Sequence, residues 1–446
     1  MRFDDTIYAL ASAPGKAAVA IVRVSGKGAA EAVRELSGGD LPAPRQAVLR
    51  KLVDPHTGEQ IDRALVLWFP GPASYCGEDM AEFHLHGGRA VIAAMLRVLG
   101  DRDGLRPAEA GEFSRRAFEN GKLDLTAAEG IADLVDAETD IQRHQALRQS
   151  GGALAELYNN WRQKLEEIRA LVETDIDFSD QELPDDVLAP VAAGVRDIAS
   201  EISRHLQDGG WGERLRDGIQ IVIIGPVNAG KSSLINYLVG RDAAIVGPEG
   251  GTTRDVIEVR LDLAGWPVNI ADTAGLRDMS GGVEAEGIRR ARARAQAADL
   301  KIILFDGARW PELDDEAEAQ IDDNAIVVLN KIDLLPEDSG AVAIGDAEAI
   351  KISCMTGEGI DELLDRIKYF LETRYRPSAS PILTRARHRH ALENCLAALQ
   401  RYDANDGSEL AAEELRLAAN ALGRITGRVD IEKLLDIIFM DFCIGK

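Results

Sequence analysis

Hydrophobic and polar residues alternate with two different periods along this chain. Residues 1–120 contain apolar runs of strand length, at 18–24 and 64–69, separated by glycine and proline turns. Residues 90–99 instead repeat apolar positions with helical spacing. The pattern therefore predicts a small α+β domain over residues 1–120.

Helical spacing dominates on both sides of a different, strand-rich stretch at 217–374. The apolar faces comprise Ala128, Ile131, Ala132, Leu134, Val135, Leu165, Ile168, Leu171 and Val172 before it, and Leu392, Cys395, Leu396, Leu399, Leu415, Ala418, Leu422, Leu434, Leu435 and Ile438 after it. We therefore expect one all-α helical domain formed by 121–216 and 375–446, with residues 217–374 inserted into it as a separate domain.

The inserted stretch opens with a phosphate-binding pattern. The apolar run 219–224 precedes the glycine-rich turn 225–230, and helical spacing follows from Lys231. In this order, backbone N–H groups and a helix N-terminus face an anion. Lys231 would reach the β- and γ-phosphates of a nucleotide, and Ser232 would hold Mg²⁺.

Three further segments each follow a strand-like run, which places them at the carboxyl ends of strands, where α/β sheets bind ligands. Asn330, Lys331 and Asp333 supply a carboxylate that accepts from the N1–H and amine of guanine, an edge that adenine lacks. Residues 272–275 add a metal-side element, and Ser353 lies in a loop under the base. The four segments together predict an α/β Ras-like P-loop GTPase domain over 217–374.

The residue that orients water in regulatory GTPases is a glutamine directly after the element at 272–275. Here that position is Leu276, which cannot orient water. We expect Glu284, in a glycine-rich loop, to position the attacking water instead. The alternative is that Glu284 is a helix N-terminal charge before Ile288.

A monovalent cation could supply the positive charge that an arginine finger supplies elsewhere. The side-chain oxygen of Asn228, inside the phosphate turn, is one candidate ligand for K⁺. The segment 250–255 contributes a threonine for Mg²⁺ and a run of backbone carbonyls.

Charge and composition narrow the range of partners. The 446 residues include 75 acidic and 51 basic side chains, a net charge of −24, which argues against a chain that coats nucleic acid by itself. The 4 cysteines show no metal-ligand spacing, so free thiols in a reducing cytoplasm are expected. The sequence predicts neither a signal peptide nor a membrane span.

Two polar clusters each allow two interpretations. Residues 74–86 combine acidic side chains with His84 and His86, and form either a metal site or a polar loop shaped by its glycines. The basic run 385–390 forms either an RNA-facing patch or a solvated helix start.

The complete set of motifs resembles the MnmE (TrmE) family of tRNA uridine modification GTPases. The matching segments extend from one end of the chain to the other and are 5–7, 23–26, 74–79, 86–88, 111–114, 120–125, 228–232, 251–255, 272–277 and 443–446. The chain departs from the family pattern at Val227, Gly247 and Glu249. The last two would bind K⁺ through backbone carbonyls, so substitution there is tolerable.

The resemblance implies specific roles for individual residues. Folate would be bound by Arg23, Glu82, Lys122 and Lys446, with Cys443 either a catalytic thiol or a small buried residue. Mg²⁺ would be held by Ser232 and Thr253, and K⁺ by Asn228, Gly247, Glu249 and Thr252. Together with the motifs above, GTP would be contacted by Asn228, Ala229, Gly230, Lys231, Ser232, Ser233, Gly247, Pro248, Glu249, Gly250, Gly251, Thr252, Thr253, Asp272, Thr273, Ala274, Gly275, Asn330, Lys331, Asp333 and Ser353.

The resemblance also implies partners. Residues 1–120 would dimerise and bind 5-formyl-tetrahydrofolate or 5,10-methylene-tetrahydrofolate. A flavoprotein, MnmG, would bring FAD and form a heterotetramer that adds an aminomethyl-type group to carbon 5 of the wobble uridine of certain tRNAs. The alternative is a GTPase switch in ribosome assembly or signalling, with no modification chemistry of its own.

Overall fold

The computed structural model describes residues 5–177, 189–207, 210–241, 258–272, 296–335, 340–375, 381–403, 408–429, 432–440 and 442–445. The chain forms two compact units. The first consists of residues 1–132, 149–195 and 397–446, and the second of residues 133–148 and 196–396. Among the described residues, no helix is both long enough and apolar enough to cross a membrane.

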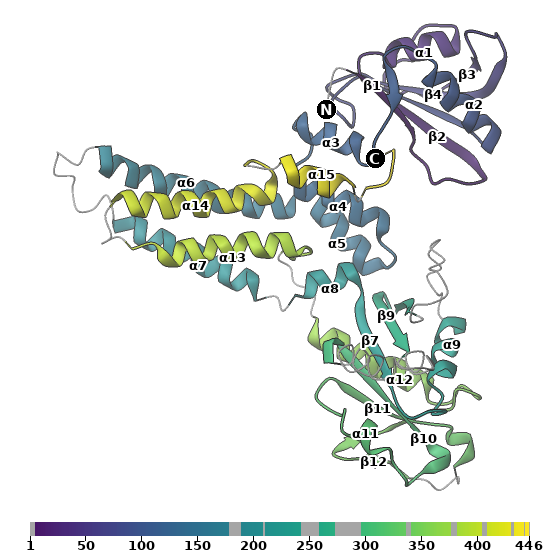
Figure 1. Cartoon of the computed structure of the whole chain (residues 1–446), viewed down its shortest axis with the longest axis vertical. Coiled ribbons are helices and arrows are strands. Elements are labelled where there is room, and N and C mark those ends of the chain that lie inside the picture. The colour runs from purple at the N-terminus through teal and green to yellow at the C-terminus, as the bar shows by residue number, and fades with distance from the viewer. Residues whose placement is uncertain are drawn as a thin grey trace, which may run out of the picture. The chain divides into compact units, whose positions relative to one another are not determined.

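The N-terminal part of the first unit is a six-stranded mixed sheet with the strand order β3-β4-β5-β2-β1-β6 (Figure 1). Its strands are β1 (Thr6–Leu10), β2 (Ala17–Ser25), β3 (Val48–Val53), β4 (Gln60–Phe69), β5 (Met80–Gly87) and β6 (Leu105–Pro107). Helices α1 (Ala29–Ser37) and α2 (Arg89–Gly100) bury one face, where Val22, Val66 and Phe83 alternate with outward residues as the strand period of two requires. The predicted α+β fold is confirmed.

The opposite face of this sheet is only partly covered. Near one end, Ile7, Met80 and Phe113 of α3 (Glu112–Glu119) form a small second core. Leu49 and Leu65 lie directly opposite each other on β3 and β4 and stay exposed. Arg23 of β2 and Glu82 of β5, two of the predicted folate residues, pair with each other on this face.

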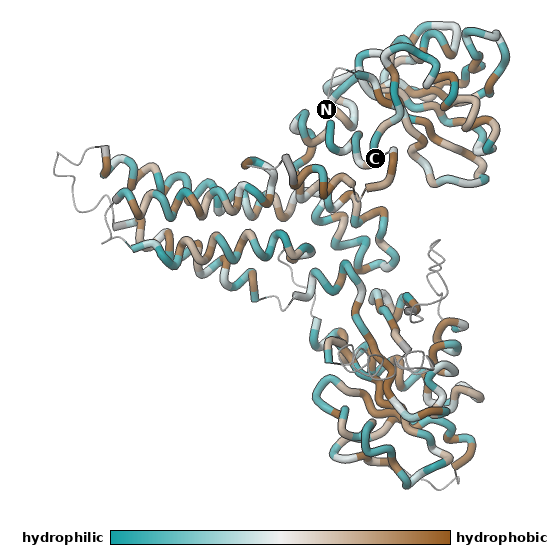
Figure 2. The backbone as a smooth tube through the Cα atoms, viewed as in Figure 1, coloured by the Kyte–Doolittle hydropathy of each residue, from teal (hydrophilic) through white to brown (hydrophobic). Residues whose placement is uncertain are grey.

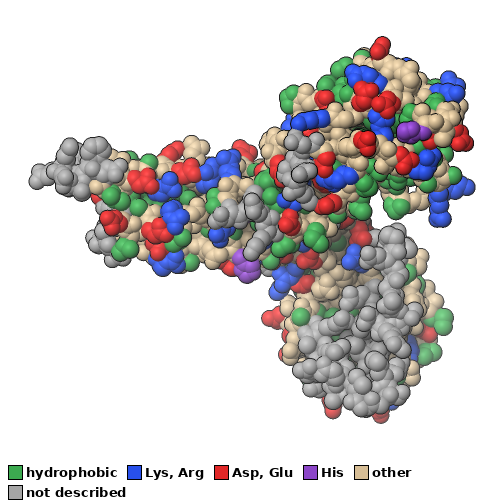
Figure 3. Space-filling model, turned by 45° about the horizontal axis from the view of Figure 1, so that its top comes forward, with side chains coloured by type: hydrophobic (Ala, Val, Ile, Leu, Met, Phe, Trp, Pro, Cys, Tyr) green, Lys and Arg blue, Asp and Glu red, His purple; other side chains and the backbone are tan. Residues whose placement is uncertain are grey.

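The rest of the first unit is helical. Its helices are wholly or partly α4 (Leu125–Asp136), α5 (Asp140–Ser150), α6 (Ala153–Asp177), α7 (Ala189–Leu206), α13 (Ala386–Arg401), α14 (Ser408–Thr426) and α15 (Glu432–Met440). Helix α14 lies along α6, although the whole nucleotide-type domain separates them in sequence (Figure 1). The helical segments that precede and follow the nucleotide-type domain therefore pack against each other through α6 and α14, while the division into one helical domain of 121–216 and 375–446 stays a prediction. Acidic and basic side chains are interspersed along the helices in Figure 3.

The second unit contains a six-stranded sheet in the order β14-β11-β10-β7-β9-β8. Its strands are β7 (Ile219–Ile224), β8 (Glu258–Leu263), β9 (Trp266–Asp272), β10 (Leu300–Asp306), β11 (Ala325–Asn330) and β14 (Ile350–Lys351). All neighbouring strands are parallel except the β8–β9 hairpin. Strands buried on both faces read as continuous apolar runs, and Figure 2 shows this sheet as the brown centre of the unit.

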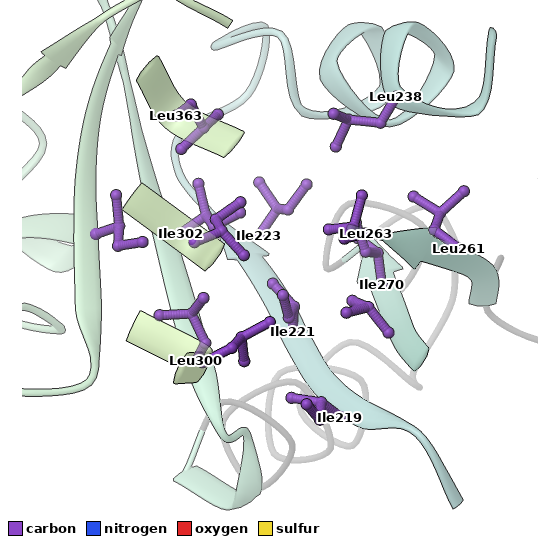
Figure 4. Close-up of a cluster of buried hydrophobic side chains, with 14 of the residues drawn as sticks. Ile219, Ile221, Ile223, Leu238, Leu261, Leu263, Ile270, Leu300, Ile302 and Leu363 are labelled. Carbon is purple, nitrogen blue, oxygen red and sulfur yellow. The ribbon is translucent and has the colours of Figure 1, made fainter. Parts of the chain in front are cut away.

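Helices α8 (Trp211–Asp217), α9 (Lys231–Arg241) and α12 (Ile360–Arg374) flank this sheet. Figure 4 shows Ile219, Ile221 and Ile223 of β7 packed between strand residues on either side, with Leu238 of α9 and Leu363 of α12 above them. The predicted α/β domain is confirmed, while the boundaries at 120, 216 and 374 stay predictions.

Candidate functional sites

The phosphate-type turn connects β7 to α9. Asn228 has a φ of +65° and Gly230 a φ of +100°, so the chain passes twice through the left-handed region. A Cβ on Gly230 would lie 2.1 Å from Nδ2 of Asn330, so only glycine fits there. The Lys231 ammonium donates to the carbonyl oxygens of Gly225 at 2.9 Å and Pro226 at 2.8 Å. The turn therefore holds its lysine folded over its own backbone.

Asn330 joins the phosphate turn to the base-side loop. Its side chain is buried, Nδ2 donates to the Ala229 carbonyl at 2.8 Å, and Oδ1 accepts from the Cys354 N–H at 3.2 Å. A buried amide with both ends paired locks the neighbouring segments in one geometry. Two motifs about a hundred residues apart in the chain are thus one site.

Asp333 is oriented by Ser353. The Ser353 hydroxyl donates to Asp333 Oδ1 at 2.6 Å, and the backbone N–H groups of Met355 and Thr356 each donate to that hydroxyl oxygen at 3.2 Å. The other carboxylate oxygen of Asp333 can still accept a hydrogen bond from a bound base. Both predicted base-side residues therefore lie together, with the serine positioning the carboxylate.

Asp306 was missed by sequence reasoning. It ends β10, lies in register with Asn330 of β11, and accepts from the Lys331 ammonium at 2.6 Å. Lys331 itself has a φ of +64°, a strained value for a lysine. The sequence did contain one signal for Asp306: it is a carboxylate at the end of the strand that precedes the Asn-Lys-x-Asp strand.

Cys354 follows Ser353 but offers no thiolate to this site. Burial, with a smaller contribution from the nearby Asp333 carboxylate, raises the pKa of the Cys354 thiol to about 11. The side chain therefore stays a neutral thiol at physiological pH, and its part in the site is the backbone N–H given to Asn330.

Several predicted residues can be placed only in part. Ser232 and Ser233 lie exposed in the first turn of α9, and Asp272 ends β9. The other predicted nucleotide, metal and catalytic positions, and one folate position, lie outside the described residues. They are Gly247, Pro248, Glu249, Gly250, Gly251, Thr252, Thr253, Thr273, Ala274, Gly275, Glu284 and Lys446.

Arg23 and Glu82 form the centre of the N-terminal site. They face each other on β2 and β5, with Nε and Nη2 of the arginine 3.0 Å and 2.9 Å from Oε1 of the glutamate. The guanidinium lies over the rings of Tyr75 and Phe113, 5.4 Å and 5.6 Å from their centroids. His84 contacts the second carboxylate oxygen at 3.3 Å. The pair is thus a fixed, partly buried polar platform beside an aromatic wall.

The C-terminal segment reaches this platform. Ile444 forms a strand-like bridge with Ala110, and the Gly445 carbonyl accepts from Arg23 Nη1 at 3.3 Å. Gly445 has a φ of +99°, and a Cβ there would lie 2.3 Å from the Leu10 carbonyl oxygen. The Cys443 side chain is exposed, so the buried-residue alternative is wrong. Lys122 donates to the Pro72 carbonyl at 3.1 Å, beside the loop that carries Tyr75.

A buried cluster of ion pairs lies close to the Arg23–Glu82 platform. The Arg116 side chain is 1% exposed and contacts Asp5, Glu78 and Glu112. Burial on its own would raise the pKa of Glu112, but hydrogen bonds from Arg106, from the Glu109 N–H and from Arg116 hold that pKa below its usual value. Glu78 is therefore used in holding the fold, as is the buried Cys76.

The structure bears on both ambiguous clusters, and in the first of them Glu82, His84 and His86 lie on strand β5 rather than in a loop. Among the described residues, no group of three or more His, Cys, Asp and Glu side chains could hold a metal ion. In the basic run, Arg385 pairs with Asp133, Arg389 pairs with Glu213, and His388 is buried. The run does begin a helix, α13, as one interpretation predicted, but these three side chains are paired or buried rather than solvated.

A phosphate turn and a guanine-type base loop, joined through Asn330 at the carboxyl ends of a mostly parallel sheet, define a P-loop GTPase domain. The family models described as "GTP-binding protein TrmE N-terminus" and "MnmE helical domain" match residues 6–122 and 125–443. The chain belongs to the MnmE family.

Named relatives agree along the whole chain. A tRNA modification GTPase MnmE from Paramagnetospirillum magneticum is 55% identical, covering 99% of this chain and 100% of its own length. One from Parvibaculum lavamentivorans is 53% identical, with coverage of 99% and 100%. The mitochondrial 5-taurinomethyluridine-[tRNA] synthase subunit GTPB3 of Homo sapiens is 47% identical, with coverage of 99% and 93%.

Proposed function

We propose that this chain hydrolyses GTP and couples that reaction to the modification of the wobble uridine in tRNA. The observation that carries the proposal is the base-side geometry, in which Ser353 orients Asp333 and Asn330 ties that loop to the phosphate turn. A carboxylate fixed at that place accepts two hydrogen bonds from guanine and none from adenine. Family membership supplies the link to tRNA.

Exchanging the acceptor for a donor tests the nucleotide. Asp333→Asn would present an amide to the base, which suits xanthine, whose carbon 2 carries an oxygen in place of the guanine amine. We expect GTP hydrolysis to fall at least 100-fold and xanthosine triphosphate to become the better substrate. Asp346→Asn, on the exposed turn between β12 and β13, is the matched control. Unchanged GTP preference in the first variant would defeat the proposal.

Metal ions complete the proposed reaction. Ser232 and Thr253 would hold Mg²⁺, which offsets phosphate charge, while Asn228, Gly247, Glu249 and Thr252 would hold K⁺. Glu284 would position the attacking water. Two measurements test these roles: hydrolysis should be faster in KCl than in NaCl at equal ionic strength, and Glu284→Ala should slow single-turnover hydrolysis without weakening nucleotide binding.

The N-terminal platform is the proposed site for a tetrahydrofolate one-carbon donor, either 5-formyl- or 5,10-methylene-tetrahydrofolate. A carboxylate such as Glu82 accepts from the pterin amine and ring N–H, and Arg23, Lys122 and Lys446 offer donors to carbonyls or carboxylates. The aromatic wall of Tyr75 and Phe113 beside Arg23 supports this choice. Cys443, exposed on the adjoining segment, is the candidate thiol.

Titration with labelled 5-formyl-tetrahydrofolate tests that site directly. Glu82→Gln keeps the side-chain size but removes the charge, so we expect affinity to fall about tenfold, the worth of one charged hydrogen bond. Glu59→Gln, on an exposed turn of the same domain, should bind like the unchanged protein. Equal affinities for both variants would remove the platform from the proposal.

The proposed assembly is a cytoplasmic homodimer that joins an MnmG-type flavoprotein, which holds FAD, in a heterotetramer. The net charge of −24 suits a partner that supplies most of the basic surface for tRNA. Nucleoside analysis of tRNA from a deletion strain separates this proposal from a GTPase switch in ribosome assembly. Unmodified wobble uridine supports it, whereas normal tRNA with defective ribosomes contradicts it.

A further inference from the structure

Helices α4 and α5 are each shared between the two compact units. Residues 133–148, which we call the α4–α5 corner, group with the nucleotide-binding unit, although the rest of both helices groups with the first unit. Charge pairs hold the start of the corner: Asp133 Oδ1 accepts from Arg385 at 2.7 Å and from Arg216 at 3.2 Å. The corner is therefore attached to the unit that contains the GTP site.

Gln142 anchors the corner by backbone contacts. Its Oε1 accepts from the N–H groups of Glu138 and Thr139 at 2.9 Å and 3.1 Å, which caps the start of α5. Its Nε2 donates to the carbonyls of Leu215 and Arg216 at 3.1 Å and 3.3 Å. Those carbonyls lie at the end of α8, directly before the strand that leads to the phosphate turn.

Ile141 and Glu138 contact the β8–β9 hairpin. The Ile141 side chain packs against the core of the unit and lies 3.7 Å from where a Cβ on Gly265 would be, at the hairpin turn. Glu138 Oε1 lies 3.7 Å from Nη1 of Arg260 on β8. The corner thus contacts the hairpin at its turn and along its outer strand.

The opposite end of this hairpin belongs to the nucleotide site. Strand β9 ends at Asp272, and β8 begins five residues after the predicted Mg²⁺ ligand Thr253. Seven extended residues span roughly 20 Å, so a shift at the nucleotide end reaches the turn through two hydrogen-bonded strands. The two strands are paired along the whole length of β8, from Glu258 opposite Ala271 to Leu263 opposite Trp266.

The other ends of α4 and α5 are tied together inside the first unit. Gln149 donates to the buried Thr126 carbonyl at 3.1 Å. A Cβ on Gly130 would lie only 2.5 Å from the Ser150 backbone N, so the two helices touch backbone to backbone. Close-packed interiors transmit strain, so we expect a displacement of one of these helices to act on the other.

We infer that the α4–α5 corner senses the position of the β8–β9 hairpin and passes the nucleotide state along α4 and α5 to the first unit. This inference depends on the proposed GTPase function, because it needs two nucleotide states with different contacts. Ile141 and Gln142 are the coupling residues: one follows the hairpin turn, and the other keeps the helix start fixed to α8. Within the part of the chain that the structure describes, neither residue is among the proposed nucleotide or folate positions or hydrogen-bonded to one of them.

Amide hydrogen exchange on the full chain tests the inference, with Mg²⁺ and either GDP or a non-hydrolysable GTP analogue. We expect peptides within residues 124–150 to exchange at different rates in the two states. In the double variant Ile141→Ala, Gln142→Ala that difference should fall by at least half, while GTP hydrolysis stays within twofold. Arg143→Ala is the control, since this side chain pairs with Asp140 on its own helix.

A second pair of variants tests the same inference if the double variant does not fold. Glu138→Arg alone should reduce the nucleotide-dependent exchange difference, and adding Arg260→Glu should restore it, because both side chains reach solvent. Two outcomes overturn the inference. In one, every variant keeps the full nucleotide-dependent difference in exchange. In the other, the unchanged protein binds both nucleotides but shows no such difference. A chain that binds neither nucleotide contradicts the proposed function instead, which separates the two failures.

Discussion

The nucleotide site and the N-terminal platform are built in opposite ways. The nucleotide site lies at one edge of a parallel sheet, where short motifs follow their own strands and meet because strand ends meet. The platform lies on the face of a mixed sheet and combines β2, β5, the loop at Tyr75, α3 and the C-terminal segment. The residues of a site at strand ends can be recognised in short sequence motifs. The residues of a site on a sheet face depend on the register between strands and on segments far apart in the chain.

Glycine substitution breaks the nucleotide half of this comparison most severely. Gly230→Ala places a Cβ 2.1 Å from Asn330 Nδ2 at a φ of +100°. Strain of about 3 kcal/mol, together with a displaced Asn330, should weaken GDP affinity more than 100-fold. Gly240→Ala, in α9 just after this turn and with open space around it, should bind GDP normally and melt at a slightly higher temperature. Calorimetric titration with GDP measures both, and matched affinities would show that the turn tolerates a side chain.

Arg23→Met tests whether the platform is independent of the nucleotide site. Removing the guanidinium leaves Glu82, which is 14% exposed, without its main partner. We expect affinity for 5-formyl-tetrahydrofolate to fall about 30-fold, or about 2 kcal/mol, with GTP hydrolysis unchanged. Arg34→Met, at an exposed pair with Glu31, is the control. A matching loss of GTP hydrolysis would show that the two sites share one structural support.

The pH dependence of stability sharpens the contrast, because buried ion pairs lie under the platform. The lowered folded-state pKa of Glu112 means that its stabilisation is fully present above the unfolded pKa of about 4.3 and is lost as the pH falls below it. Glu112→Gln should cost about 2 kcal/mol of unfolding free energy at pH 7 and less near pH 3. Urea unfolding at both values measures this, with Glu31→Gln as control; a pH-independent loss would contradict it.

Ser353→Ala is the mildest test. It removes the 2.6 Å hydrogen bond to Asp333 but leaves the carboxylate in place. Losing one charge-assisted hydrogen bond of about 1.5 kcal/mol should weaken GDP affinity about tenfold and leave the preference over ADP intact. Thr356→Ala, three residues further along the same loop and exposed, should have no effect. A loss of guanine preference would mean that the serine, and not Asp333, discriminates the base.

Much of the nucleotide site could be predicted because each motif carries its own geometry. The turn 225–230, the loop at Asn330 and the loop at Ser353 each follow a strand, and parallel strands align their carboxyl ends. Asp306 escaped because a carboxylate after a strand is common, and only the register of β10 with β11 places it beside Lys331.

The contacts in the N-terminal and helical regions were harder to predict, because they join residues that are far apart in the chain. Strand and helix periods predicted which elements form, and the resemblance indicated Arg23 and Glu82. Neither predicted that Arg385 and Arg389 of the basic run would form ion pairs with Asp133 and Glu213. No short sequence pattern marks opposite charges on distant helices as partners. The Asp5, Glu78, Glu112 and Arg116 cluster likewise depends on long-range contacts.

The sequence by itself determined the order of the domains, the guanine-binding motifs and the family, since these depend on local periodicity and on residues a few positions apart. Only the tertiary structure decided that Asn330 joins the phosphate turn to the base loop, that the C-terminal segment reaches Arg23, and that residues 133–148 belong with the nucleotide-binding unit. Those contacts join residues far apart in the chain, and their partners are selected by packing and burial rather than by any local preference.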